Sequence, residues 1–458
     1  MTSLKVRKAL SIAVLLAASS TVYAQGAHAP AAPVHAPAAP AAVVPAAAAA
    51  PEPAPVAEPA VVPTTPIAVS TPAIPEPAPA AKPAAPTISV AGTKISLYGF
   101  LQLNAVYEDG ANGGLNWSNY VLKNAQDGEG RLLINVNQTR LGLNLAGPAK
   151  ETGAEVSGKF ESDFVAKQDR FPNGVGGFRI RHAYGQLKFN DIGLSLLFGQ
   201  TQDIIAPLVA PSLNQGALQG DGSLGTRRPM IRAAQALGPV EIAAAVTDNR
   251  DAAAPVLPAF QGSVKAKVPA SWAGEKQNVE FILSGHYASL ENAADDSTGK
   301  EAKKADTYPK QTSWSGIASL SLPVISIVNL SGEFFYGQNL GNYNVGSIGQ
   351  TGVLSKTGAG LQSTGGWGAA NIKLPADFAL AGGYGVESIN KSREPKEGRV
   401  KNQVIFTNLR YFVDEAVFVG FEYANLLTRY ADNADPDNRQ TDKGKLNRYE
   451  LVLNYSFK

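Results

Sequence analysis

The chain ends in RYELVLNYSFK (Arg448–Lys458), a stretch in which every second residue is apolar. One face of an extended chain carries Tyr449, Leu451, Leu453, Tyr455 and Phe457. The other face is polar except for Val452. This two-residue period predicts a β-strand. Chain ends usually fray, so a strand that continues to the last residues needs a partner along its whole length.

The same period recurs from Thr87 onward, for example in KISLYGFLQLNAVYEDG, AEVSGKFESDF and NVEFILSGHYAS. The breaks between these segments alternate in length. Short ones such as FND and LPAD alternate with long ones near 109–130, 202–226 and 290–311. The pattern predicts about sixteen strands, with short turns at one end and long loops at the other.

Alternating strands with this loop asymmetry are typical of a bacterial outer-membrane barrel. In hydrocarbon every backbone N–H and C=O needs a partner, and only a closed barrel provides one for each strand. A soluble two-sheet sandwich also alternates, but it would need one core for all these apolar faces. We therefore predict an all-β fold, a closed antiparallel transmembrane β-barrel. Its last strand closes against the first, Lys94–Glu108, and its terminal aromatics lie in an interfacial girdle.

The N-terminal residues predict the compartment. Lys5, Arg7 and Lys8 precede a short apolar stretch, and the triplet Val22-Tyr23-Ala24 fits signal cleavage before Gln25. We predict a signal peptide at 1–24 and an outer-membrane location in a Gram-negative-type bacterium. Residues 25–90 are mostly Ala, Pro and Val, which predicts an extended periplasmic spacer. Residues 91–458 then form the barrel domain. The spacer either contacts peptidoglycan or has no partner.

The composition excludes several functional classes. The 458 residues include no cysteine, which excludes disulfides, thiol catalysis and cysteine–zinc sites, and a net charge of +2 gives no reason to expect nucleic acid as a partner. No cofactor or metal is expected. The barrel holds two histidines, His182 and His286, and no G-x-S-x-G motif, so we predict no enzyme activity. Two alternatives to a channel stay open: an envelope-tethering protein and a barrel enzyme.

Several stretches carry a family resemblance: SLYGFLQLNAVY, NQTRLGLNL, FRIRHAYGQL, LLFGQT and RRPMIRA. In this order they resemble the bacterial outer-membrane porin superfamily, most closely the DcaP-like trimeric porins. The resemblance implies a water-filled diffusion channel, a homotrimer in outer-membrane lipid, and an infolded loop after the fifth strand. Two features depart from it: Lys458 follows the terminal Phe457, and the Pro/Ala segment stands where some relatives have a coiled coil.

Strand parity predicts which cations face the lumen. Apolar neighbours face lipid, so the residues predicted to face water as a basic constriction wall are Arg140, Lys159, Arg179, Arg181, Arg228 and Arg232. Such a wall favours small anionic solutes. In the alternative interpretation these cations only pair with Glu155, Glu161 and Asp163.

The segment Gly199–Arg228 is the predicted infolded loop, because its apolar residues need burial. Its acids Asp203 and Asp221 are predicted to oppose the basic wall. Its GDGSLG stretch lacks the strand and helix of a nucleotide site. By the same parity, His182 and Gln186 face outward, at a subunit interface or near the membrane edge.

Overall fold

The computed structural model describes residues 87–457, except for 113–117, 124–129, 149–152, 167–175, 215, 217, 250–256, 291–310, 342, 344–354, 396–397 and 432–442. The predicted signal peptide, nearly all of the predicted spacer and Lys458 lie outside the described residues. Within the described part of the chain, no helix is long and apolar enough to cross a bilayer.

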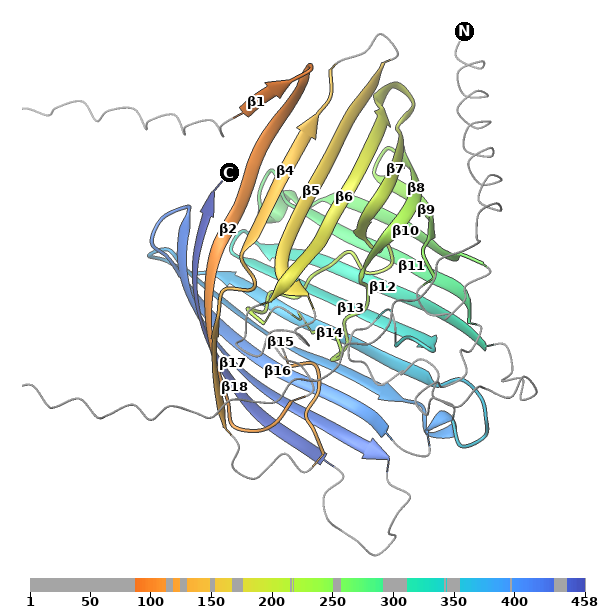
Figure 1. The fold of residues 1–458 in the computed structure, drawn as a ribbon, viewed down its shortest axis with the longest axis vertical. Helices are drawn as coiled ribbons and strands as arrows, with labels where there is room; N and C mark the ends of the chain where they lie inside the picture. The colour runs from red at the N-terminus through yellow and green to blue at the C-terminus, as the bar shows by residue number, and fades with distance from the viewer. Residues whose placement is uncertain are drawn as a thin grey trace, which may run out of the picture. The chain divides into compact units, whose positions relative to one another are not determined.

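The described strands form a closed antiparallel barrel (Figure 1). Its first strand, β2 (Thr93–Glu108), pairs with the last, β18 (Lys443–Phe457), from Glu108 opposite Arg448 to Gly99 opposite Phe457. Two short strands, β3 and β4, pair with successive parts of β2 and together occupy one position. The barrel therefore has sixteen strand positions, which confirms the predicted fold and the predicted closure.

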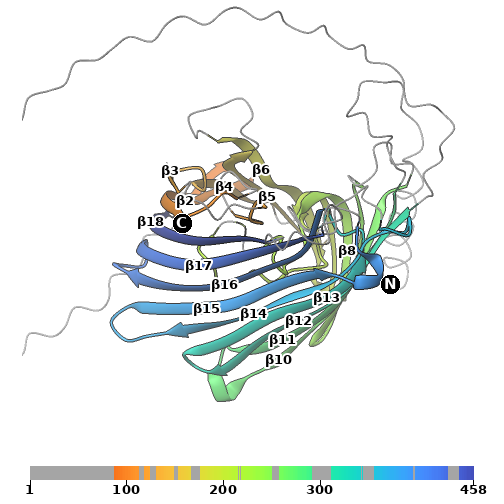
Figure 2. The same cartoon turned by 90° about the horizontal axis from the view of Figure 1, so that it is seen from below.

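Consecutive strands are neighbours around the barrel, as Figure 2 shows from below. The strands between β2 and β18 are β3 (Arg131–Asn135), β4 (Arg140–Ala146), β5 (Ala154–Ala166), β6 (Gly177–Phe189), β7 (Leu194–Gln202), β8 (Arg227–Leu237), β9 (Val240–Thr247), β10 (Ala259–Pro269), β11 (Asn278–Leu290), β12 (Gln311–Ile325), β13 (Val328–Gln338), β14 (Gln362–Lys373), β15 (Phe378–Ile389), β16 (Gly398–Phe412) and β17 (Val417–Ala431). The short 3₁₀ helices of the described residues are η1 (Asn190–Ile192), η2 (Ser271–Ala273) and η4 (Lys391–Arg393).

A short hairpin precedes the barrel. Strand β1 (Thr87–Val90) pairs with the start of β2, over Thr93–Ser96. The predicted boundary between spacer and barrel domain, at residue 90, is therefore wrong by one strand. The reason is a two-residue turn at Ala91 and Gly92, whose φ angles are both positive (49° and 79°). This turn reverses the chain, so Thr87–Val90 pair with β2.

The two faces of each strand differ as predicted. In β18 the apolar residues Tyr449, Leu451, Leu453 and Tyr455 are exposed, whereas Arg448, Glu450 and Asn454 are at most 5% exposed. The pattern is the reverse of a soluble protein, because the exposed apolar face meets lipid. The rings of Tyr107 and Tyr423 lie 6.2 and 5.3 Å from that of Tyr449, so a cluster of tyrosines stands on the outer face near the long-loop end.

Part of the chain fills the barrel interior. Residues 203–226, which follow the fifth strand position, fold inward and bond to strands on several sides, as predicted for the infolded loop. The bonds are Ser284 Oγ to the Ile205 carbonyl, Asn408 Nδ2 to the Pro211 carbonyl (2.8 Å), Asn402 Nδ2 to the Gly220 carbonyl (2.9 Å) and the Leu224 amide to Glu333 Oε1 (3.2 Å). Loop residues Ala210 and Leu218 share an apolar cluster with Trp367 and Phe406 of the wall.

A β-bulge interrupts the pairing of β5 with β6. Glu161 lies opposite His182, but the next residue, Ser162, lies opposite Ile180, so Arg181 is an extra residue in β6. An extra residue reverses the in–out parity of every following position. The side chains of β6 that precede and follow the bulge therefore cannot be assigned with one parity.

Candidate functional site: an arginine-lined cavity

A cavity of about 410 Å³ lies between the infolded loop and the barrel wall. Five arginines line it: Arg140, Arg179, Arg181, Arg227 and Arg410. The amides of Gln102, Gln138, Gln202, Asn214 and Gln219 line it as well, with an apolar border from the loop and from β17 and β18. None of the described residues that line this cavity is a carboxylate. We call this space the arginine cavity.

Two buried acids orient the arginines on β4 and β6. Arg179 binds Asp163 through two bonds of 2.8 and 2.6 Å. Arg181 donates to Glu161 (2.7 Å) and to Asp163 (2.8 Å), and Arg140 Nε lies 3.5 Å from Glu161. The acid side chains are at most 4% exposed, whereas those of Arg140 and Arg179 are 28% and 31% exposed. The acids lie behind the cations, so positive charge faces the cavity.

Tyr98 of β2 completes the support of these acids. Its hydroxyl donates to Glu161 Oε2 (2.8 Å), and Lys159 Nζ lies 4.9 Å from its ring centre. The ring lies over Gly142, where an added Cβ would come within 2.1 Å of Tyr98 Cζ. Glycine at 142 is therefore required for Tyr98 to reach Glu161. The predicted wall residue Lys159 is 3.7 Å from the same acid, but it does not border the cavity.

Two arginines of the cavity, Arg227 and Arg410, were not predicted. Within the described residues Arg227 has no carboxylate within 4 Å. The cations Arg140, Arg179 and Arg181 lie within electrostatic range of it, as does the more distant carboxylate of Asp163. Arg410 of β16 donates to the Pro211 carbonyl of the loop (2.5 Å). Arg227 precedes a predicted residue at the strand end, where parity is weakest. The sequence offered one signal for Arg410: polar Asn408 lies two residues before it in β16, so alternation places both side chains on the same inward face.

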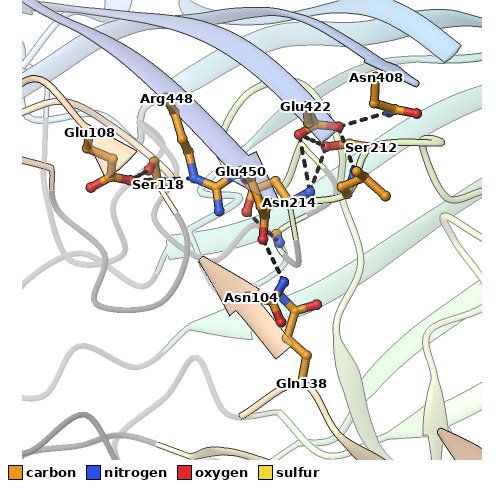
Figure 3. A network of polar contacts seen from close by, with 12 residues as sticks. Asn104, Glu108, Ser118, Gln138, Ser212, Asn214, Asn408, Glu422, Arg448 and Glu450 are labelled. Carbon is orange, nitrogen blue, oxygen red and sulfur yellow. Dashed lines mark hydrogen bonds and ion pairs between the residues drawn. The ribbon is translucent and has the colours of Figure 1, made fainter. Parts of the chain in front are cut away.

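Glu422 of β17 holds the loop tip. Its carboxylate accepts bonds from Ser212 Oγ (2.8 Å) and from the amides of Leu213 (2.6 Å) and Asn214 (3.2 Å). Asn408 Nδ2 donates to it as well (2.9 Å), as Figure 3 shows. One side chain thus fixes the loop segment that borders the arginine cavity, because a loop has no regular partner for its own amides.

A second ionic network is buried where β18 meets β2 (Figure 3). Arg448 Nη1 donates to Glu450 (2.6 Å), and its Nε lies 3.5 Å from Glu108. Asn104 Nδ2 donates to the other oxygen of Glu450 (2.7 Å). All four residues are at most 1% exposed. This sealed network joins the first and last strands and presents no charge to water.

Arg228 and the loop acids do not form part of the arginine cavity. Arg228 is 1% exposed; its Nε lies 3.0 Å from Asp203, and its guanidinium lies 4.0 Å from the Tyr343 ring centre. Asp203 also accepts from the Thr226 amide (2.9 Å), so it ties the two ends of the loop together. Asp203 therefore faces Arg228 and Arg232 of the predicted basic wall, but not the arginines that line the arginine cavity.

Asp221 lies against the other side of the barrel and is 3% exposed. Burial, and then the nearby Glu387 carboxylate, raise the pKa of this loop acid well above its usual range. It does not oppose the arginines, which corrects the prediction. The neighbouring glycines of GDGSLG explain the close approach: an added Cβ at Gly222, whose φ is +112°, would be 2.2 Å from the Gly366 carbonyl. These glycines serve packing between loop and wall.

Arg232 and Gln186 line a different cavity, of about 480 Å³, whose charges are mixed. Its charged lining residues are Lys188, Arg232, Lys265, Glu155, Asp203 and Glu241. Lys265 and Glu241 pair at 2.7 Å. Arg232 faces inward as predicted, but the structure does not bring it together with Arg140, Arg179 and Arg181. Gln202 borders both cavities and connects them.

The predicted outward direction of His182 and Gln186 is wrong. His182 Nδ1 lies 3.0 Å from Thr201 Oγ1, and its Nε2 lies 3.8 Å from Glu161. Gln186 Nε2 donates to Ser195 Oγ (2.6 Å) and lines the mixed cavity. Both side chains face the interior because the bulge at Arg181 reverses the parity of the rest of β6. The predicted subunit contact through these residues is not supported.

No protein-family model matches the chain, and no curated protein matches it detectably. Several solved structures, however, resemble this chain. The outer membrane channel DcaP of Acinetobacter baumannii is 20% identical at a TM-score of 0.65, over 81% of this chain and 99% of that one. The anion-selective porin from Comamonas acidovorans is 12% identical at 0.52, over 80% and 100%. OmpF of Salmonella typhi, in complex with daunomycin, is 12% identical at 0.51, over 81% and 100%. The chain therefore has the closed sixteen-stranded barrel fold of the outer-membrane porins, with the apolar outer surface that this membrane requires.

Proposed function

We propose that the protein is a diffusion channel of the outer membrane that favours small hydrophilic anions. The observation that carries this proposal is the arginine cavity, which lies between the infolded loop and the wall and is lined by five arginines and no described carboxylate. Charge at the narrowest part of a pore determines which ions enter it. The name of one similar structure, an anion-selective porin, agrees with this proposal.

Electrostatics supports an anion preference even though the net charge of the chain is +2. Cations that line a narrow lumen with low-dielectric walls focus their field on a passing ion. Arginine stays protonated at physiological pH, and its planar fork suits carboxylate and phosphate groups. Glu161 and Asp163 neutralise part of this charge but lie behind the guanidinium groups, so a solute meets the cations first.

Assembly and the alternative functions rest on separate observations. We propose a homotrimer on the family resemblance. A tethering role for the spacer remains a prediction. An enzyme is not supported: His286 lies between Ser313 and Ser315, at 2.8 and 2.6 Å, but it is 6% exposed and stacked against Tyr343 with ring centres 3.7 Å apart. No substrate could reach that histidine without moving the loop.

The test is a reversal-potential measurement on the purified full-length protein in a planar bilayer under a KCl gradient. We expect the sign that corresponds to anion preference, and a larger preference at low salt, where screening is weak. A wild-type channel that prefers cations would contradict the proposed anion preference, but not the proposal that the protein is a diffusion channel. A protein that inserts into the bilayer yet conducts no ions would contradict both.

A further inference from the structure

The mixed cavity, of about 480 Å³, lies towards the short-turn end of the barrel. Two of its lining residues show this: Glu155 is the second residue of β5, and Lys188 is the last but one of β6. Strand β8 runs from one cavity to the other. Arg227 borders the arginine cavity, and Arg232, in the mixed cavity, follows it by five residues, about 17 Å at the rise of a strand. Because Gln202 borders both spaces, a solute can pass from the first into the second.

Part of the charge in the mixed cavity is compensated within the wall. Lys265 Nζ lies 2.7 Å from Glu241. Asp203 lies 3.0 Å from Arg228 and accepts a bond from Gln261 Nε2 (2.6 Å). These groups already have partners, so they are not the ones that a solute would bind first.

Three other charged side chains of the mixed cavity lack an opposite charge. Glu155 has no cation within 4 Å among the described residues, and Lys188 and Arg232 have no described carboxylate within that distance. Glu155 and Lys188 lie directly opposite each other in β5 and β6, where Cβ atoms are about 4.5–5.5 Å apart, yet their charged groups do not pair. Uncompensated charges of both signs therefore border one cavity.

Small side chains leave room beside these charges. The register continues the row of Glu155 and Lys188 across the next three strands through Ser195, Ala234 and Ala243, and all five residues border the cavity. Sites for small molecules typically have volumes of about 300–1,000 Å³. The mixed cavity is thus large enough for a solute of the size of an amino acid together with water.

We propose that the mixed cavity binds zwitterionic solutes of the amino-acid class, with the carboxylate towards Lys188 and Arg232 and the ammonium group towards Glu155. Charge-assisted hydrogen bonds hold a carboxylate on lysine and arginine, and an ammonium group on glutamate. A simple anion would satisfy the two cations but leave Glu155 without a partner, and a simple cation would do the reverse. This inference rests on the proposed channel function and adds a solute class to it.

The experiment measures tracer uptake of two uncharged or net-neutral solutes of similar size by proteoliposomes that contain the full-length protein. L-Alanine is a zwitterion, whereas lactamide has a hydroxyl and an amide in place of the ammonium and carboxylate groups. Rates are corrected with protein-free liposomes. The ratio of the alanine rate to the lactamide rate removes differences in the amount of open channel, and heat-modified gel mobility verifies that each variant forms the barrel.

The test variants are Glu155→Gln and Arg232→Gln. The matched control is Glu280→Gln, which removes an acid near the short-turn end of β11. Glu280 pairs with Lys267 (2.6 Å) and does not border the mixed cavity.

We expect the wild type to take up alanine about two- to fivefold faster than lactamide at low concentration, the gain typical of an exposed ion pair. Alanine uptake should saturate, because an occupied site admits no second solute, while lactamide uptake stays linear. Each test variant should bring the two rates together and remove the saturation, and the control should keep the wild-type ratio. Equal rates in the wild type would overturn the site, as would an unchanged ratio in Glu155→Gln or an equal loss in Glu280→Gln.

Two further measurements separate this inference from its neighbours. L-Lactate is an anion with the carbon skeleton of alanine, and its uptake is measured in excess KCl. If lactate saturated at the same concentration as alanine, the site would be one for simple anions and the assignment to zwitterions would be overturned. Reversal potential is measured on the same preparation: a cation-selective wild type with saturable alanine uptake would contradict the proposed anion preference and support the site in the mixed cavity.

Discussion

Two ionic networks face the interior of this barrel, and they differ in which partner meets water. At the arginine cavity, Glu161 and Asp163 are buried while Arg140 and Arg179 are about one-third exposed. In the sealed network of β18 and β2, Arg448 and both of its acids are at most 1% exposed. The residue types are the same. The first network can act on a passing ion, whereas the second can only hold strands together.

The difference arises from what lies opposite each wall. The infolded loop bonds to Glu422, Asn408 and Asn402 on β16 and β17, and Ser118 and Val121 of the first long loop bond to Glu108 and Thr428 beside the sealed network. The loops leave open the space that Arg140, Arg179, Arg181, Arg227 and Arg410 line. The comparison teaches that the positions of the inward-folded loop segments decide whether the charge of an arginine meets water or is buried. Four predictions test it, in decreasing order of effect on stability.

The largest effect is expected from Arg448→Met. Removing the cation leaves Glu108 and Glu450 buried without it, which typically costs about 3–5 kcal/mol of unfolding free energy. Chemical unfolding of the detergent-solubilised protein measures the change. The control is Arg131→Met, which also removes a partner of Glu108 (2.7 Å) but is 38% exposed, so about 1 kcal/mol or less is expected. Equal effects of the two variants would mean that the network is not sealed.

A smaller effect is expected from Glu422→Gln. The amide cannot accept all the bonds that Ser212, Leu213 and Asn214 donate to the carboxylate, and each charge-assisted bond contributes roughly 1.5–3 kcal/mol. The loop tip should loosen, so single-channel recordings should show larger and noisier conductance. Glu241→Gln, a luminal acid that pairs with Lys265 away from the loop tip, is the control. A quiet, unchanged conductance in Glu422→Gln would show that the loop does not depend on this residue.

Asp221→Asn should change how stability depends on pH. Burial and the Glu387 carboxylate raise the pKa of Asp221 in the folded protein, while an unfolded aspartate titrates near pH ~3.9. Its contribution to stability is therefore fully present below about pH 4 and is lost as pH rises towards the folded pKa. The variant should match the wild type in thermal unfolding at pH 4 and exceed it at pH 7.

The control for that prediction is Asp191→Asn, an exposed residue of η1, which should give the same difference from the wild type at both pH values. If Asp221→Asn gave no pH-dependent gain in stability, Asp221 would not be buried next to Glu387.

The smallest effect on stability, and the largest on selectivity, is expected from Arg227→Gln. This arginine has no described carboxylate partner, so its removal leaves no acid unpaired and stability should change by no more than about 0.5 kcal/mol. Reversal potential should shift towards cations, more at 0.1 M salt, where the screening length is about 10 Å, than at 1 M, where it is about 3 Å. Arg232→Gln, in the mixed cavity, should shift it less. Equal shifts would contradict the distinction between the two cavities.

Much of the fold could be predicted from the chain alone, because the alternation of apolar and polar residues in each strand shows which face meets lipid and which faces the interior. The apolar residues of β18 face lipid and the polar ones face inward whatever the neighbouring strands are. Loop lengths alternate because one end of the barrel needs short turns. Sixteen positions, closure of β18 on β2 and an inward loop after the fifth strand follow from these local patterns, and the structure agrees with them.

The site could be predicted only in part. Arg140, Arg179 and Arg181 line the arginine cavity, but the parity argument failed for His182 and Gln186, which follow the bulge in β6. The extra residue of the bulge depends on how β5 and β6 pair, and no residue of β6 by itself reveals it. Arg410 was not predicted for a related reason. It lies far in sequence from the other arginines of the cavity, and only closure of the barrel brings β16 to face β6.

The sequence by itself determined that this chain forms a closed barrel in lipid, because alternation and loop length are local properties that hold along every strand. Tertiary structure alone decided which charges meet water. That choice depends on where the infolded loop rests, on the bulge in β6 and on contacts such as Glu422 with Leu213, which join residues 209 positions apart. Exposure is a property of the assembled lumen, so arginines of the same chemistry are partly exposed at β4 and β6 and buried at β18.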